Sequence, residues 1–442
     1  MLIDAATLHD LDVLIASTPR GRTLWSLVDR TRSRAGREHL RRSLTAPGHT
    51  AAGIVQRQRA HQALARDLGG YGRLLDALGA DEVDRYLAAT WQLPSAQPAL
   101  AGVGLWRPAW FKEYLRAIDE GRARVLAALT AATTMRDRLA ATDAELLQGV
   151  ADTLTAALAS PQVSELRVLA NRRSASALMA FDGVARDTGR PMLAATLEAI
   201  GVVDAMWSLA AATAERGWTY PRPSTRLAVE GLYNAFLEPG HGGVANDLRL
   251  DDRARVCVVT GPNMAGKSTF LRAIAVAVLL AHAGCGVPAA SMEFAAVATI
   301  FSSVQITDDL AAGESFYLAE VRRIRALAEA LHEHRSMLAV LDEPFRGTNV
   351  HDATEASLGV ISRLVAHPGA LVFVATHLAE VATALRDDPR VQFLCFSADL
   401  AGDRPVFDYR LREGVSTQRL GMTLLRQERV LDLLEHRPAP ER

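Results

Sequence analysis

The stretch VVTGPNMAGKSTFLRA, residues 258–273, constrains the fold most, because it puts a glycine-rich turn between a buried strand and a helix. The aliphatic run 255–260 predicts the strand, and a helix is expected from about residue 267. The spacing G-x-x-x-x-G-K-[ST] is met by Gly261, Gly266, Lys267 and Ser268. Glycines let backbone N–H groups converge on phosphate oxygens, and a helix N-terminus adds positive potential. We therefore expect a phosphate-binding loop.

The lysine of this loop is informative, because Lys267 is one of only two lysines in a chain with 49 basic residues. A compact ammonium on a flexible stem can reach between the β- and γ-phosphates of a nucleotide, where the planar fork of arginine does not fit. The hydroxyl of Ser268 can complete a magnesium shell. A purely structural glycine turn is the weaker alternative, so ATP and Mg²⁺ are the expected ligands.

Two further strand ends carry polar residues of the matching kind. MLAVLDEP ends in Asp342, which can hold magnesium through water, and Glu343, which can polarise an attacking water. ALVFVATH ends in His377, which can contact the γ-phosphate or orient water. Taken alone, an acidic pair or a histidine at a strand end is more often structural. Following a phosphate loop, both favour a catalytic role.

The pattern of apolar residues divides the chain in two. From about residue 20 to residue 217, alanine and leucine recur three and four apart, which is typical of packed helices, with a break at residues 92–110. After a second break at residues 218–226, short aliphatic runs alternate with helical stretches, as in a buried parallel sheet. We predict a mainly α domain over residues 1–224 and an α/β domain over residues 225–442.

Composition limits the partners. The formal net charge of −1 gives no support for nucleic-acid binding by overall basicity. A local patch is possible, because residues 20–60 hold ten arginines against Asp29 and Glu38. A solvated helix face is an equally good interpretation of this segment. The ten are Arg20, Arg22, Arg30, Arg32, Arg34, Arg37, Arg41, Arg42, Arg57 and Arg59.

The expected location is the cytoplasm, with no membrane partner. Cys257, Cys285 and Cys395 lie far apart, which argues against a zinc site or a disulfide framework. The first residues are acidic where a signal peptide has a basic flank, and we expect the apolar stretch 273–281 to be the longest, which is too short to cross a bilayer.

Several of these segments together resemble the MutS family of DNA mismatch-repair ATPases. GPNMAGKST is similar to the family's phosphate loop, and LDEPFRGTNVHD to its second nucleotide-binding segment. DDLAAGESFYLAE, residues 308–320, resembles its signature segment, VANDL the stretch before the loop, and VATH its histidine switch. The order of these segments is that of ABC-type ATPases. The resemblance therefore implies an α/β P-loop ABC-type ATPase domain.

The resemblance also implies roles for single residues. Asp342 would bind magnesium, Glu343 would activate water, and His377 would sense the γ-phosphate. Gly313 and Ser315 would project into the site of a partner subunit, so that two composite sites close a homodimer around ATP. The loop would hold the phosphates and the magnesium through Gly261, Pro262, Asn263, Met264, Ala265, Gly266, Lys267, Ser268 and Thr269.

The helical half resembles the family more weakly. RTLWSLVDRTRSRAGREHLRRSL is similar to the start of the MutS core or lever domain, which extends the resemblance to about residues 20–425. The residues expected to pack there are Leu24, Leu27, Val28, Leu40 and Leu44.

The sequence also departs from the pattern of the family in several places. We expect a short form without the N-terminal mismatch-recognition and connector domains, with a reduced or missing DNA clamp, at most one C-terminal helix for dimerisation and no Smr extension. Where the family often has an aromatic residue that stacks on adenine, this chain has Gly242 and Gly243, so base binding is less firmly predicted than phosphate binding.

The expected function is ATP hydrolysis coupled to dimer rearrangement and passed to a helical domain that contacts DNA, in mismatch repair or related DNA metabolism. Two alternatives stay open. One is a relative of the second bacterial MutS subfamily, acting on branched DNA or on ribosomes. The other is a nucleotide-gated interaction protein that does not recognise mismatches.

Overall fold

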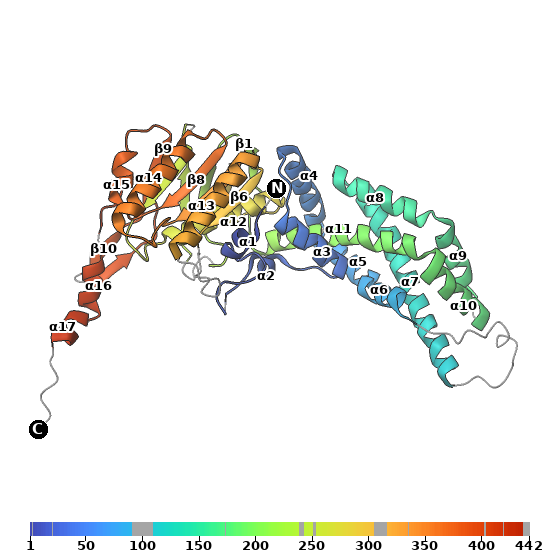
Figure 1. Cartoon of the computed structure of the whole chain (residues 1–442). Coiled ribbons are helices and arrows are strands. Elements are labelled where there is room, and N and C mark those ends of the chain that lie inside the picture. The colour runs from blue at the N-terminus through green and yellow to red at the C-terminus, as the bar shows by residue number, and fades with distance from the viewer. Residues whose placement is uncertain are drawn as a thin grey trace, which may run out of the picture. The chain divides into compact units, whose positions relative to one another are not determined.

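The computed structural model describes the chain except residues 2, 20, 91–108, 173, 238–242, 251–252, 305–315, 335, 402–403, 419 and 436–442. The chain divides into two compact units, each shown in Figure 1. The α/β unit contains Met1–Leu27, Leu44–Ile54 and Gly217–Arg442. The helical unit contains Val28–Ser43 and Val55–Arg216.

The helical unit is built from long amphipathic helices whose apolar faces share one core. Leu64, Leu129, Met135, Leu154 and Phe181 are among its fully or almost fully buried side chains. Polar side chains begin three of the helices by accepting a backbone hydrogen bond, as Asp67, Ser160 and Ser174 do. The helices are α3 (Arg34–Thr45), α4 (Ala51–Ala65), α5 (Leu68–Leu78), α6 (Ala80–Ala88), α7 (Ala109–Ala140), α8 (Glu145–Leu158), α9 (Pro161–Ala170), α10 (Ala175–Gly183), the π-helical turn Val184–Thr188 and α11 (Arg190–Glu215).

Helix α11 corrects one expectation from the sequence. Among the described residues it is the one helix long and apolar enough, by length and composition, to cross a membrane, whereas the sequence predicted that no apolar stretch is long enough. Most of α11 is buried within the helical unit, which is typical of a core helix. Its buried Asp204 and Ser208 accept hydrogen bonds from the backbone N–H groups of Ser33 (2.8 Å) and Arg30 (2.7 Å). Packing inside the unit therefore accounts for its apolar character.

The main sheet of the α/β unit has six strands in the order β12-β9-β4-β8-β7-β6. All neighbours are parallel except β12, which is antiparallel to β9. The bounds are β4 (Val256–Thr260), β6 (Thr299–Ser303), β7 (Met337–Asp342), β8 (Ala370–Ala375), β9 (Val391–Cys395) and β12 (Arg412–Glu413). The carboxyl ends of neighbouring parallel strands meet at one edge of such a sheet, which is where ligands bind in open α/β folds.

Helices cover both faces of this sheet, because successive side chains of each strand point to opposite faces and both sets are apolar. Val256, Val258, Val372 and Val374 share a core with residues of α13 (Phe316–Glu333), α14 (Val350–Ala366) and α15 (Ala379–Ala384). Phe373 lies between Val372 and Val374, so its side chain is on the opposite face of the sheet. There it contacts Phe270 of α12 (Lys267–His282), with ring centroids 6.4 Å apart. Figure 1 shows α13 and α14 in front of the strands.

Smaller elements complete the unit. A second sheet has the order β1-β5-β2-β3, and β10 and β11 form an antiparallel pair. The bounds are β1 (Arg222–Ser224), β2 (Ala228–Leu232), β3 (Asn246–Arg249), β5 (Ser291–Ala295), β10 (Ala398–Ala401), β11 (Arg404–Phe407), α16 (Gly421–Gln427) and α17 (Val430–Glu435).

The N-terminal segment also belongs to the α/β unit, with α1 (Ala5–Asp10) and α2 (Leu24–Val28). The buried carboxylate of Asp10 accepts hydrogen bonds from the N–H of Val304 (2.8 Å) and the hydroxyl of Ser302 (3.1 Å), at the end of β6. Arg323 of α13 donates to the hydroxyl of Thr7 (2.8 Å) and lies over the ring of Phe301. A segment at the start of the chain therefore anchors β6 and α13.

The expected combination of a mainly helical part and an α/β part is present. The division itself differs from the single boundary predicted near residue 225, because it falls at residue 217 and assigns residues 1–27 and 44–54 to the α/β unit. The predicted break at residues 92–110 lies largely outside the described residues. The predicted packing residues are confirmed, since each is at most 1% exposed: Leu24, Leu27, Val28, Leu40 and Leu44.

Candidate functional site

The glycine-rich turn connects the fully buried strand β4 directly to α12. Gly261 has a φ of +142°, and a Cβ there would lie 2.6 Å from the carbonyl oxygen of Phe396, so the first loop position requires glycine. The buried ammonium of Lys267 donates to the carbonyl oxygens of Gly261 (2.9 Å) and Pro262 (3.2 Å). The lysine thus folds back over its own loop, where phosphate oxygens can compete for its three protons.

Asp342 ends β7 beside the start of α12. Its carboxylate is hydrogen-bonded to Ser268, while burial raises its pKa. The Oδ1 atom is buried and has no hydrogen-bond partner within the described part of the chain. A buried carboxylate oxygen without a partner is costly unless a ligand satisfies it. Beside a serine hydroxyl, it provides the oxygen ligands that Mg²⁺ prefers.

The described residues contain no group of three or more His, Cys, Asp or Glu side chains arranged to hold a metal ion. A magnesium ion at Asp342 and Ser268 would therefore take its remaining ligands from phosphate and water, which is its usual manner of binding beside nucleotides.

Glu343 lies between the ammonium of Lys267 and the imidazole of His377. Its carboxylate is 3.7 Å from Nζ of Lys267 and 3.6 Å from Nδ1 of His377. The proximity of His377, aided by Lys267, lowers the pKa of Glu343, and the Glu343 carboxylate raises the pKa of His377. Glu343 has a φ of +49°, and its N–H donates to the carbonyl of Ala375 (2.9 Å). The end of β8 therefore holds the backbone of a residue in a rarely populated conformation.

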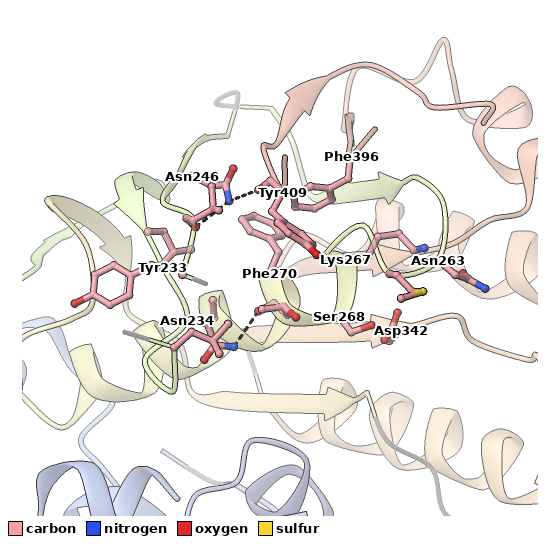
Figure 2. Close-up of a pocket in the computed structure, with 18 of the residues that line it drawn as sticks. Tyr233, Asn234, Asn246, Asn263, Lys267, Ser268, Phe270, Asp342, Phe396 and Tyr409 are labelled. Carbon is pink, nitrogen blue, oxygen red and sulfur yellow. Dashed lines mark hydrogen bonds between the residues drawn. The ribbon is translucent and has the colours of Figure 1, made fainter. Parts of the chain in front are cut away.

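These groups line one cavity of about 600 Å³. One end of it is polar, and the other is aromatic and apolar, as Figure 2 shows for part of each. The residues of the polar end are Asn263, Lys267, Ser268, Thr269, Asp342, Glu343 and Arg346, and Asn234 and Asn246 lie toward the aromatic end. The apolar and aromatic residues include Leu232, Tyr233, Leu237, Val244, Phe270, Phe396 and Tyr409. A cavity of this size and composition suits a small organic ligand with an anionic group.

The sequence did not predict the aromatic end of the cavity. Tyr409 stacks on Phe407 with ring centroids 6.0 Å apart and has a φ of +55°. The side chain of Asn246 fixes this segment, because its Nδ2 donates to the carbonyl of Tyr409 (3.0 Å) and its Oδ1 accepts from the N–H of Leu411 (2.6 Å). Figure 2 shows the first of these bonds. No local pattern links residue 246 to residue 409, so only the fold could bring them together.

The predicted site residues divide into three groups. Asn263, Met264, Gly266, Lys267, Ser268, Thr269, Asp342 and Glu343 line the cavity. His377 reaches the cavity through Glu343, and the backbone of Gly261, Pro262 and Ala265 shapes the loop without lining it. Gly313 and Ser315 lie outside the described residues, as does Gly242, whereas Gly243 lines the cavity.

Five of the ten arginines in the arginine-rich segment are paired with carboxylates. Arg30 contacts Glu215 (2.7 Å), Arg32 contacts Asp76 (3.4 Å) and Arg37 contacts Asp81 (3.0 Å). Arg41 and Arg42 both contact Glu38. This arrangement favours the solvated-face interpretation over a basic patch, although α3 keeps four arginines against one glutamate.

Comparison with known proteins places these features in a family. Residues 257–431 match the family model of MutS domain V. The chain is 35% identical over 234 residues to DNA mismatch repair protein MutS 2 of Halobacterium salinarum, covering 52% of this chain and 27% of that protein. It is 32% identical over 240 residues to DNA mismatch repair protein MutS of Myxococcus xanthus, covering 52% of this chain and 27% of that protein. The chain thus spans about a quarter of the length of these relatives.

Proposed function

Because this chain is a member of the MutS family through its domain V (residues 257–431), we propose that it is an ATPase acting in DNA mismatch repair or related DNA metabolism. The proposal rests on one observation above all. The ammonium of Lys267, the unpartnered oxygen of Asp342 and the carboxylate of Glu343 converge in a single cavity beside a glycine-rich turn. This is the set of groups that phosphoryl transfer to water requires.

In the proposed reaction the loop binds the triphosphate of ATP. The N–H groups at the start of α12 and the ammonium of Lys267 would hold the phosphate oxygens, with Asn263 near the γ-phosphate. Asp342 and Ser268 would hold Mg²⁺, which when bound neutralises charge on the phosphates. Glu343 would accept a proton from the attacking water, and its lowered pKa keeps the carboxylate charged for that step.

The aromatic end of the cavity would hold the base. Tyr409 offers an exposed ring face beside the loop, in a chain that has Gly243 where the family often has an aromatic residue. Base stacking on an aromatic ring is sequence-tolerant, so this end contributes affinity more than selectivity.

We further propose a homodimer in which Gly313 and Ser315 complete the partner's site. DNA would contact the helical unit, and the cytoplasm would be the location. The pairing of the arginines with carboxylates supports the alternative in which the same ATPase acts as a nucleotide-gated interaction protein that binds no duplex.

Titration calorimetry and a phosphate-release assay test the ATPase. Lys267→Ala is expected to weaken Mg·ATP binding at least about tenfold, because the ammonium is lost from the phosphate site. Glu343→Gln is expected to bind ATP nearly as wild type does while kcat falls about a hundredfold, and to accumulate as the dimer. The matched control is Lys112→Ala, which removes the chain's other lysine from the exposed face of α7. Wild-type protein that shows no heat of ATP binding with Mg²⁺ present contradicts the proposal.

A further inference from the structure

A buried carboxylate outside the cavity holds the loop that carries the site's glutamate. Glu320 lies on α13, one turn after the helix begins, and is 2% exposed. Its Oε2 accepts a hydrogen bond from the backbone N–H of Gly347 (3.1 Å). Burial raises the pKa of Glu320, and the backbone N–H groups of Gly347, Arg346 and Phe345 act in the opposite direction. A buried carboxylate that accepts a backbone hydrogen bond fixes the path of that backbone.

The loop held in this way, residues 343–347, has an unusual backbone. Glu343 and Phe345 both have positive φ values, +49° and +66°, although neither is glycine. Such conformations are unfavourable for residues with a Cβ atom and persist only where surrounding contacts impose them. The first of these contacts is the bond from the N–H of Glu343 to Ala375 at the end of β8, and Glu320 supplies the second, at the far end of the loop.

Close packing against the start of α13 also fixes the position of the loop 343–347. A Cβ on Gly347 would lie 2.6 Å from Cδ1 of Phe316, 3.0 Å from the backbone nitrogen of Tyr317 and 3.2 Å from Oε2 of Glu320. The loop backbone therefore lies directly against the first turn of α13, where only glycine fits. The ring of Tyr317 packs on Phe345 with centroids 6.2 Å apart, and Arg346 lies over the ring of Phe316 at 5.1 Å.

We propose that Glu320 is a positioning residue for the water-activating step, holding residues 343–347 so that Glu343 and Arg346 face the nucleotide cavity. This inference rests on the proposed function and adds a residue to it. Arg346 lines the cavity and Glu320 does not, so the carboxylate acts only through the backbone it binds. The position of α13 is thereby linked to the geometry of the hydrolytic site, whereas Lys267 and Ser268 belong to the first turn of α12.

The variants Glu320→Ala and Glu320→Gln test this, with Glu329→Gln as the matched control. Glu329 lies on the same helix but is exposed and pairs only locally with Arg325 in the part of the chain described. The alanine removes the acceptor, and the glutamine removes the negative charge and replaces one of the two acceptor oxygens with an NH₂ donor. If the alanine variant does not fold, the near-isosteric glutamine variant serves alone.

The first measurement uses the nucleotide-free protein and needs no ATPase activity. Hydrogen–deuterium exchange should rise at residues 343–350 in the Glu320 variants and stay at the wild-type level in Glu329→Gln. The second measurement separates binding from turnover: kcat should fall at least about tenfold while the Kd for Mg·ATP stays within about threefold.

Unchanged exchange at residues 343–350 overturns the inference, and so does raised exchange with wild-type kcat. A parallel loss of ATP affinity, kcat and melting temperature also overturns it, because that pattern indicates a general structural role. Failure of the proposed function is a distinct result: the wild-type protein itself then fails to hydrolyse ATP, whatever the exchange data show.

Discussion

The pairing of Glu343 with His377 is the residue-scale feature with the clearest consequence. The two side chains shift each other's pKa in opposite directions, downward for Glu343 and upward for His377. A carboxylate that serves as a base must be charged, so activity is expected to be lost as the pH falls through the lowered pKa of Glu343. The histidine thus extends the acidic range over which Glu343 can accept a proton.

Replacing this histidine gives a prediction about pH. In His377→Ala the main cause of the lowered pKa is gone, so the acid limb of the kcat profile should move to higher pH. A histidine that only touched phosphate would, when removed, lower kcat without moving that limb. The control is His351→Ala, an exposed histidine of α14. If the acid limb does not move in His377→Ala, His377 does not set the pKa of Glu343.

At the scale of elements, the six-residue helix α1 holds both β6 and α13 in place. Its Asp10 and Thr7 bind the end of β6, and Arg323 joins α1 to α13. These interactions join residues that are far apart in the sequence, and they fix the strand and the helix on either side of residues 305–315. The N-terminal segment is thus a structural part of the α/β unit.

The anchor at Asp10 predicts a loss of stability. Asp10→Ala leaves the N–H of Val304 and the hydroxyl of Ser302 without this acceptor in a buried position, which should cost about 2–3 kcal/mol in the free energy of unfolding. Urea denaturation measures this as a lower midpoint. Glu355→Ala, an exposed site on α14, should stay within about 0.5 kcal/mol of wild type. Equal midpoints for Asp10→Ala and wild type would show that α1 contributes little.

At the scale of the whole molecule, the property to test is duplex DNA binding by the helical unit. Helix α3 carries Arg34, Arg37, Arg41 and Arg42 but also Glu38, and most of these arginines have carboxylate partners. Exposed pairs of this kind are weak, so phosphates could compete with the carboxylates for the guanidinium groups. The overall charge neither favours nor excludes DNA binding, because the formal net charge of the chain is −1.

DNA binding through α3 predicts a change in salt dependence. Arg41→Glu combined with Arg42→Glu should weaken duplex binding and reduce the slope of log K against log salt by about 0.9 for each phosphate that the protein no longer neutralises. Fluorescence anisotropy with a labelled duplex measures both quantities. The control is Arg116→Glu on α7, where Arg116 pairs with Glu120 across the same number of residues as Arg42 with Glu38. Equal affinities for both variants and wild type would favour the protein-partner alternative.

The sequence determined the parts of this protein that depend on local order. The spacing of Gly261, Gly266 and Lys267 predicted the loop, and the aliphatic runs before Asp342 and His377 predicted strands ending at one edge. Such features are readable because they depend on neighbouring residues and on periods of two or 3.6. The family resemblance added roles for these residues, which the proposed experiments test.

Only the tertiary structure decided the interactions between distant segments. It placed Tyr409 and Asn246 at the cavity beside Lys267, joined α1 to β6, set Glu320 against the loop of Glu343 and paired three of the four arginines of α3 with carboxylates. Hydrogen bonds and burial between residues far apart in the chain leave no periodic trace in a single sequence. Their geometry exists only once the strands and helices have packed, because packing decides which polar groups lose water and must find partners.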